Sequence, residues 1–162
     1  MNSDSSLLRR YEDNLNVCGL GVIILGAWDV LKVIMQVMMN MKDATAEMLS
    51  EVTEEEQGIA IGVLIGVIAV LFLITALIFL IHYYIGINAS RAAKGMPYKK
   101  GYFVWAVILL VVSILGMLSY VDEIKDLENI ETTIASIIVD ITAIYILGTV
   151  VISTRKIKNL RQ

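Results

Sequence analysis

Four long apolar stretches, separated by short polar segments, dominate the pattern of hydrophobic and polar positions along the chain. At 1.5 Å per helical residue, about 20 residues span a hydrocarbon core of about 30 Å. Inside lipid the backbone must satisfy its own hydrogen bonds, and a helix does so within one segment. The pattern therefore predicts an all-α polytopic integral membrane protein, with four antiparallel transmembrane helices in one bundle. The expected spans cover about residues 17–41, 58–87, 102–121 and 134–153.

The polar residues 1–16 precede the first expected span. Leu8, Tyr11 and Leu15 share one helical face, which predicts a short interfacial helix that lies at the headgroups before the chain turns into the membrane. A cleavable signal peptide is the competing interpretation, but the charges and the length of the next stretch argue against it. The expected plan is an interfacial segment at 1–16, a bundle at 17–153 and a basic tail at 154–162.

The composition agrees with this plan. Of the 162 residues, 57% are hydrophobic, and the mean hydropathy is +0.75, which is typical of an integral membrane protein. Four spans use most of the chain, so we expect no separate soluble domain. A single cysteine, Cys18, excludes an internal disulfide and a multi-cysteine metal site. We expect the lipid bilayer as the surroundings, with no cofactor, no metal and no nucleic-acid partner.

Lysine and arginine fall on alternate sides of the expected spans. The N-terminal segment, the loop before the third span and the tail hold ten of the thirteen basic residues. The first and third loops are acidic and hold one lysine each, Lys42 and Lys125. Short segments rich in lysine and arginine stay in the cytoplasm, which predicts that both termini are cytoplasmic. Because nothing marks an organelle, the cell (cytoplasmic) membrane is the expected location.

Two opposite charges, Asp29 and Lys32, lie one helical turn apart inside the first expected span. An ionisable residue at such a depth is costly, and it marks a function or a buried pair. At 1.5 Å per residue, Lys32 and Asp140 both lie roughly 9 Å below the outer face of the hydrocarbon. We expect one intramembrane charge cluster of Asp29, Lys32 and Asp140, and three polar residues should complete its hydrogen bonds: Gln36, Asn40 and Ser136.

Two interpretations of this cluster stay open. In the first, the cluster holds the first span against the fourth and fixes their register, since breaking a buried ion pair is costly. Alternatively, it is a transport or proton site in which a carboxylate changes its protonation when a substrate binds. Its polar neighbours lie mostly in the outer half of the membrane, which favours a closed pair or an outward pocket over a continuous pore.

Glycines mark two further features of the second expected helix. Gly58, Gly62 and Gly66 form a doubled G-x-x-x-G, which in lipid predicts close packing against another helix. Gly95 is expected to end the helix, because glycine readily adopts the left-handed conformation of a C-cap.

Aromatic residues and methionines cluster near the expected ends of the spans. Tyr102, Phe103 and Trp105 are expected as interfacial anchors of the third span, and His82 as an interfacial residue at the same level. Methionine thioethers select Cu(I), but methionine is also ordinary packing in apolar helices. Five methionines crowd the outer end of the first span: Met35, Met38, Met39, Met41 and Met48.

These features favour a small non-catalytic membrane protein that assembles with itself, as a homo-oligomer, or with other membrane proteins. The alternative is a small oligomeric transporter or channel subunit that uses Asp29, Lys32 and Asp140. An enzyme ranks third, since the chain has no H-E-x-x-H and no G-x-S-x-G motif. The sequence names neither a substrate nor a partner.

Overall fold

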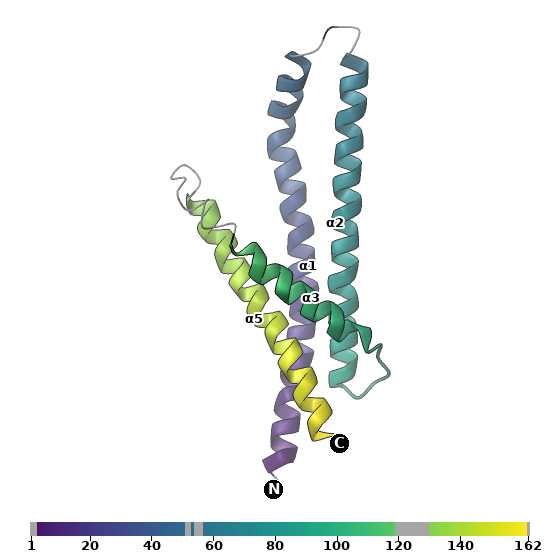
Figure 1. Cartoon of the computed structure of the whole chain (residues 1–162), viewed down its shortest axis with the longest axis vertical. Coiled ribbons are helices and arrows are strands. Elements are labelled where there is room, and N and C mark those ends of the chain that lie inside the picture. The colour runs from purple at the N-terminus through teal and green to yellow at the C-terminus, as the bar shows by residue number, and fades with distance from the viewer. Residues whose placement is uncertain (1–2, 51–52, 54–56, 119–129, 162) are drawn as a thin grey trace. The chain divides into compact units, whose positions relative to one another are not determined.

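The computed structural model describes residues 3–50, 53, 57–118 and 130–161, and these are almost entirely helical (Figure 1). Among these residues there is no strand, so the expected all-α fold is confirmed. The helices are α1 (Ser3–Ser50), α2 (Gln57–Ala93), α3 (Gly101–Gly116) and α5 (Ile130–Leu160).

Three of the described helices are long and apolar enough to cross a membrane. Their candidate spans, Asp4–Met39, Gln57–Ala93 and Ser136–Leu160, lie in α1, α2 and α5. α3 is also apolar, but its 16 residues make a shorter helix than the other three. The third expected span reaches residue 121, and its last three residues lie outside the described part of the chain. The three long helices indicate a membrane protein, whereas the antiparallel four-span arrangement stays a prediction.

The N-terminal segment is helical, but it does not form a separate interfacial helix. α1 continues without a break from Ser3 to Ser50, so the expected turn into the first span is absent. Leu8, Tyr11 and Leu15 do share a face, as expected, but they pack on the buried cluster of the protein. A packed apolar face and a lipid-facing one have the same spacing in sequence, which explains the error.

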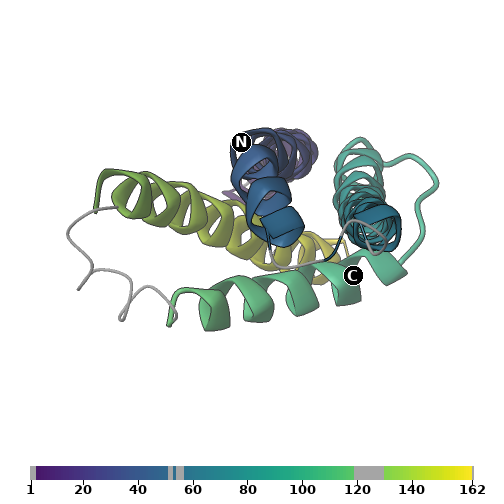
Figure 2. The same ribbon diagram turned by 90° about the horizontal axis from the view of Figure 1, so that it is seen from above.

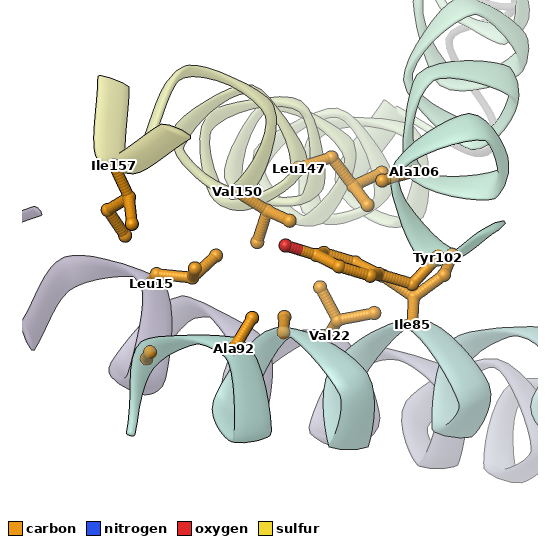
Figure 3. Close-up of a cluster of buried hydrophobic side chains, with 11 residues drawn as sticks. Leu15, Val22, Ile85, Ala92, Tyr102, Ala106, Leu147, Val150 and Ile157 are labelled. Atoms are coloured by element: carbon orange, nitrogen blue, oxygen red, sulfur yellow. The ribbon is translucent and has the colours of Figure 1, made fainter. Parts of the chain in front are cut away.

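The chain divides into two compact units. The core unit comprises residues 1–25 and 81–162, and the hairpin unit comprises residues 26–80. In the core unit, α3 packs along α5 (Figures 1 and 2). Buried apolar side chains from all four helices meet there (Figure 3): Leu15, Val22, Ile85, Ala89, Ala92, Ala93, Tyr102, Ala106, Leu147, Val150 and Ile157.

α2 ends in a Schellman motif, as the glycine at position 95 predicts. Gly95 has φ of +69°, in the left-handed region that glycine adopts without strain. The backbone N–H of Met96 donates to the carbonyl oxygen of Arg91 at 2.9 Å, and that of Gly95 donates to Ala92 at 3.2 Å. These two bonds satisfy carbonyls that the helix end leaves open, and the expected C-cap is confirmed.

The side chain of Asn88 fixes the loop that follows α2. Its Nδ2 donates to the carbonyl oxygen of Tyr84 at 2.8 Å, and its Oδ1 accepts the backbone N–H of Lys99 at 2.8 Å. Asn88 is itself buried, at 5% exposure, so both ends of its amide are paired in a protected place. The loop is thereby held against the helix from which it departs.

In the hairpin unit, the end of α1 and the start of α2 run in opposite directions (Figure 1). Most apolar residues of α2 in this unit are exposed, for example Ile65 at 61% and Leu73 at 62%, as in helices whose outer surface meets lipid. The covered positions of α2 recur at helical spacing and share one face: Gln57, Ala60, Leu64, Ile68, Thr75 and Phe79.

Candidate functional site

Two glycines let α1 and α2 come very close inside the core unit. A Cβ atom on Gly19 would lie 2.9 Å from the carbonyl oxygen of Gly86. A Cβ atom on Gly86 would lie closer still to the carbonyl oxygen of Gly19 and to the side chain of Ile23. Real Cβ atoms do not make contacts this short, so the crossing requires glycine at both positions.

Polar side chains link the helices around this crossing. The Ser90 hydroxyl donates to Oδ1 of Asn16 at 2.6 Å and joins α2 to α1. The hydroxyls of Tyr102 and Thr154 lie 2.9 Å apart and join α3 to α5. Interhelical hydrogen bonds in membrane proteins contribute about 0.6 kcal/mol on average, so their main effect is to fix which faces meet.

Tyr102 is buried in the core unit. Its side chain is 1% exposed, and in Figure 3 its hydroxyl points toward α5 beside Val150. The ring of Tyr98 packs edge-on against it, with ring centroids 5.7 Å apart. Tyr102 is therefore packed in the core unit, whereas Trp105 on the same helix is exposed, at 42%. The depth of both residues in the membrane stays a prediction.

The residues of the expected charge cluster are divided between the two units. Asp29 and Lys32 belong to the hairpin unit, and Asp140 belongs to the core unit, so their association stays a prediction. Asp29 and Asp140 are half-buried, and Lys32 is exposed. Within the hairpin unit, the covered face of α1 includes Asp29 beside apolar positions such as Val30 and Val33.

The supporting polar residues are only partly described. Ser136 is half-buried on α5. The side chains of Gln36 and Asn40 lie outside the described part of α1, so their expected hydrogen bonds are untested.

The glycine row of α2 lies open in the hairpin unit. Among the described residues, no atom comes within 4 Å of a Cβ built on Gly58, Gly62 or Gly66. These glycines are exposed, and the covered face that includes Ala60 and Leu64 lies on the other side of the helix. Within the hairpin unit the row therefore contacts no described residue, and its close packing against another helix stays a prediction.

The side chains that were candidates for a metal are spread over both units. Among the described residues, no group of three or more histidine, cysteine, aspartate or glutamate side chains is placed to hold a metal ion. His82 is packed in the core unit at 8% exposure. Four of the five methionines are at least half exposed on α1: Met35, Met38, Met39 and Met41. The side chain of Met48 lies outside the described part.

Two cavities open on the core unit. The larger, of about 560 Å³, is lined by the start of α3 and the end of α5, and its charged lining residues are all basic. The smaller, of about 370 Å³, lies beside the start of α1 and mixes charges, with Arg9 and Lys94 near Glu12 and Asp13. Between them, Arg161 donates to Oε1 of Glu12 at 2.7 Å and joins α5 to α1.

Sequence reasoning missed the residues that organise the core unit. Gly86 and Ser90 form a small-x-x-x-small pair with the same spacing as the glycine row, so a signal for close packing was present. Gly19 stands in no such pair with an obvious partner. The basic residues of the larger cavity were used for topology alone, because nothing in their spacing shows that α3 and α5 bring them together.

No protein-family model matches this chain. No curated protein and no solved structure matches it either.

Proposed function

We propose that this chain is a small non-catalytic multi-pass membrane protein that acts through helix–helix assembly with itself or with other membrane proteins. The observation that supports the proposal is the open glycine row of α2. Gly58, Gly62 and Gly66 lie on the exposed side of a helix whose opposite side is covered. Each glycine costs the helix about 0.5–1 kcal/mol relative to alanine, and a closely approaching neighbour would offset that cost.

Packing in lipid explains why this row matters more than the apolar area around it. Lipid tails are as apolar as leucine side chains, so apolar area alone does not drive helices together in a bilayer. A glycine face lets a second backbone approach closely enough for extended van der Waals contact and Cα–H···O contacts. The rest of exposed α2 is bulky, for example at Leu71 and Leu73, and is suited to lipid.

Leucine substitutions in the glycine row test the proposal on the full chain in mild detergent. Gly62→Leu and Gly66→Leu should each shift the protein toward monomer in sedimentation, because the new side chain holds two helices apart. Val67→Leu is the matched control, since position 67 is 61% exposed and lies about 140° around the helix from Gly62. A wild-type protein that is monomeric and retains no other membrane protein contradicts the proposal. So does unchanged assembly in both glycine variants.

The proposed membrane arrangement has four antiparallel spans with both termini in the cytoplasm of a cell-membrane protein. The support is the distribution of lysine and arginine, which alternates between loops. Cysteines placed at Glu55 and at Lys99 test it. An impermeant thiol reagent applied from outside should label the first and not the second, and labelling at position 99 would overturn the orientation.

A second candidate function is transport or proton movement through the charges at Asp29, Lys32 and Asp140. The observation that favours it is the presence of these three ionisable residues in otherwise apolar helices, where such groups usually serve a function or a buried pair. Asp29 and Asp140 are each half-buried in their own unit, so both carboxylates are partly shielded from solvent.

A double-mutant cycle separates this candidate from a purely structural pair. Lys32→Met and Asp140→Asn together should be less harmful to stability than the sum of the single changes, with a coupling of about 1–3 kcal/mol. If the pair is structural, the stable double variant keeps its role in cells, whereas a transport site gives a folded but inactive protein. A coupling of zero would mean that the two residues do not meet.

A further inference from the structure

The larger cavity of the core unit has a one-sided charge. Its volume of about 560 Å³ lies within the range of small-molecule sites, which is about 300–1,000 Å³. No acidic residue lines it, and apolar or aromatic side chains such as Leu15, Phe103 and Ile157 form much of the wall. Four basic residues line it: Lys100, Arg155, Lys158 and Arg161.

Most of this positive charge is uncompensated. Arg161 is bound to Glu12 at 2.7 Å, which neutralises one of the four groups. Among the residues that the structure describes, Lys100, Arg155 and Lys158 take part in no ion pair. The cavity therefore presents three free cationic groups beside an apolar wall, and an anion that also carries an apolar part would satisfy both.

The cavity lies at the border between apolar and polar sequence. Lys100 immediately precedes the apolar helix α3, and Arg155 and Lys158 follow the apolar stretch of α5. In a membrane protein this border lies at the level of the lipid headgroups. The phosphate of a lipid would thus meet the basic groups, while its acyl chains would run along the apolar side of the helices.

We propose that this basic pocket binds the phosphate headgroup of an anionic phospholipid. Arginine and lysine form strong charge-assisted hydrogen bonds with phosphate oxygens, and basic pockets between membrane helices hold such headgroups. The apolar wall distinguishes a lipid from a free phosphate, because a soluble anion gains nothing from Phe103 or Ile157. This inference concerns the core unit and is independent of assembly through the glycine row.

Lipid retention by the purified full chain tests the proposal. Native mass spectrometry in mild detergent should show phosphatidylglycerol bound in preference to phosphatidylcholine, which has the same acyl chains but no net charge. Lys100→Gln and Lys158→Gln should each weaken phosphatidylglycerol binding about fivefold, which is the usual effect of one basic residue near an anionic headgroup. Both lysines are exposed, so their loss should leave the helical fold intact, as circular dichroism can verify.

Lys156→Gln is the matched control, because Lys156 is exposed on the same helix and does not line the cavity. It should leave phosphatidylglycerol binding unchanged. Equal loss in the Lys156 variant would show diffuse surface attraction and overturn the site. Equal binding of both lipids would overturn it too. Displacement of the lipid by an equal concentration of sn-glycerol 3-phosphate would assign the pocket to soluble phosphates and overturn the lipid.

Discussion

Gly19 and Gly86 of the core unit and the glycine row of the hairpin unit meet opposite surroundings. At Gly19 and Gly86 the two helix backbones are in contact, and no Cβ atom fits at either position. A Cβ atom at Gly58, Gly62 or Gly66 would have no described atom within 4 Å. The residue type and the local helix are alike in both places, so the glycines alone do not determine which contact is made.

The two units also differ in how completely each covers its own small residues. The core unit closes its own packing with a buried cluster, a close crossing and hydrogen bonds such as Ser90 to Asn16. The hairpin unit covers one face of each helix and leaves a row of small residues outside. Closed packing stabilises the fold, whereas an open glycine face is suited to a partner.

The largest effect should come from filling the closed crossing. Gly86→Ala places a Cβ atom where the backbone of Gly19 and the side chain of Ile23 already lie, so the helices must separate. We expect a loss of about 1–3 kcal/mol, the usual cost of overpacking, as a lower thermal midpoint in mild detergent. Gly148→Ala, in open space on α5, should leave the midpoint unchanged or slightly raised. Equal midpoints for both variants would remove the distinction between closed and open glycines.

A smaller effect should follow from removing one polar link of the core unit. Tyr102→Phe keeps the buried ring but deletes the hydroxyl that meets Thr154 at 2.9 Å. We expect a loss of about 0.5–1.5 kcal/mol in unfolding by denaturant, because Thr154 keeps its bond to the carbonyl oxygen of Val150. Tyr145→Phe is the control, since Tyr145 is 71% exposed and should tolerate the change. A neutral Tyr102→Phe would make the ring alone responsible for packing.

The smallest effect should come from the exposed ion pair between Arg161 and Glu12. Its side chains are 36% and 27% exposed, so solvent screens the attraction. Glu12→Gln should lower stability by about 0.2–1 kcal/mol at low salt, and the difference should shrink as salt is added. Asp13→Gln, beside it but exposed, serves as the control for lost charge. A salt-independent loss larger than this range would mean that Glu12 acts through packing.

Much of the fold follows from local properties of the chain. Long apolar stretches predict the helices, and Gly95 predicts the end of α2 with the hydrogen bonds that are found there. The same reasoning was wrong at the N-terminus, where α1 is continuous, and it did not predict that Tyr102 is buried. In both places an amphipathic residue at helical spacing suits a lipid interface as well as a packed face.

The sequence by itself determined the helical class, the apolar length of the candidate spans and the alternation of basic segments. Each is a property of residues close together in the chain. Only the tertiary structure decided that Gly19 meets Gly86, that Ser90 finds Asn16, and that Lys100, just before α3, and basic residues of α5 line one cavity. These contacts join residues far apart in sequence, and they depend on where two helices cross, which no local pattern encodes.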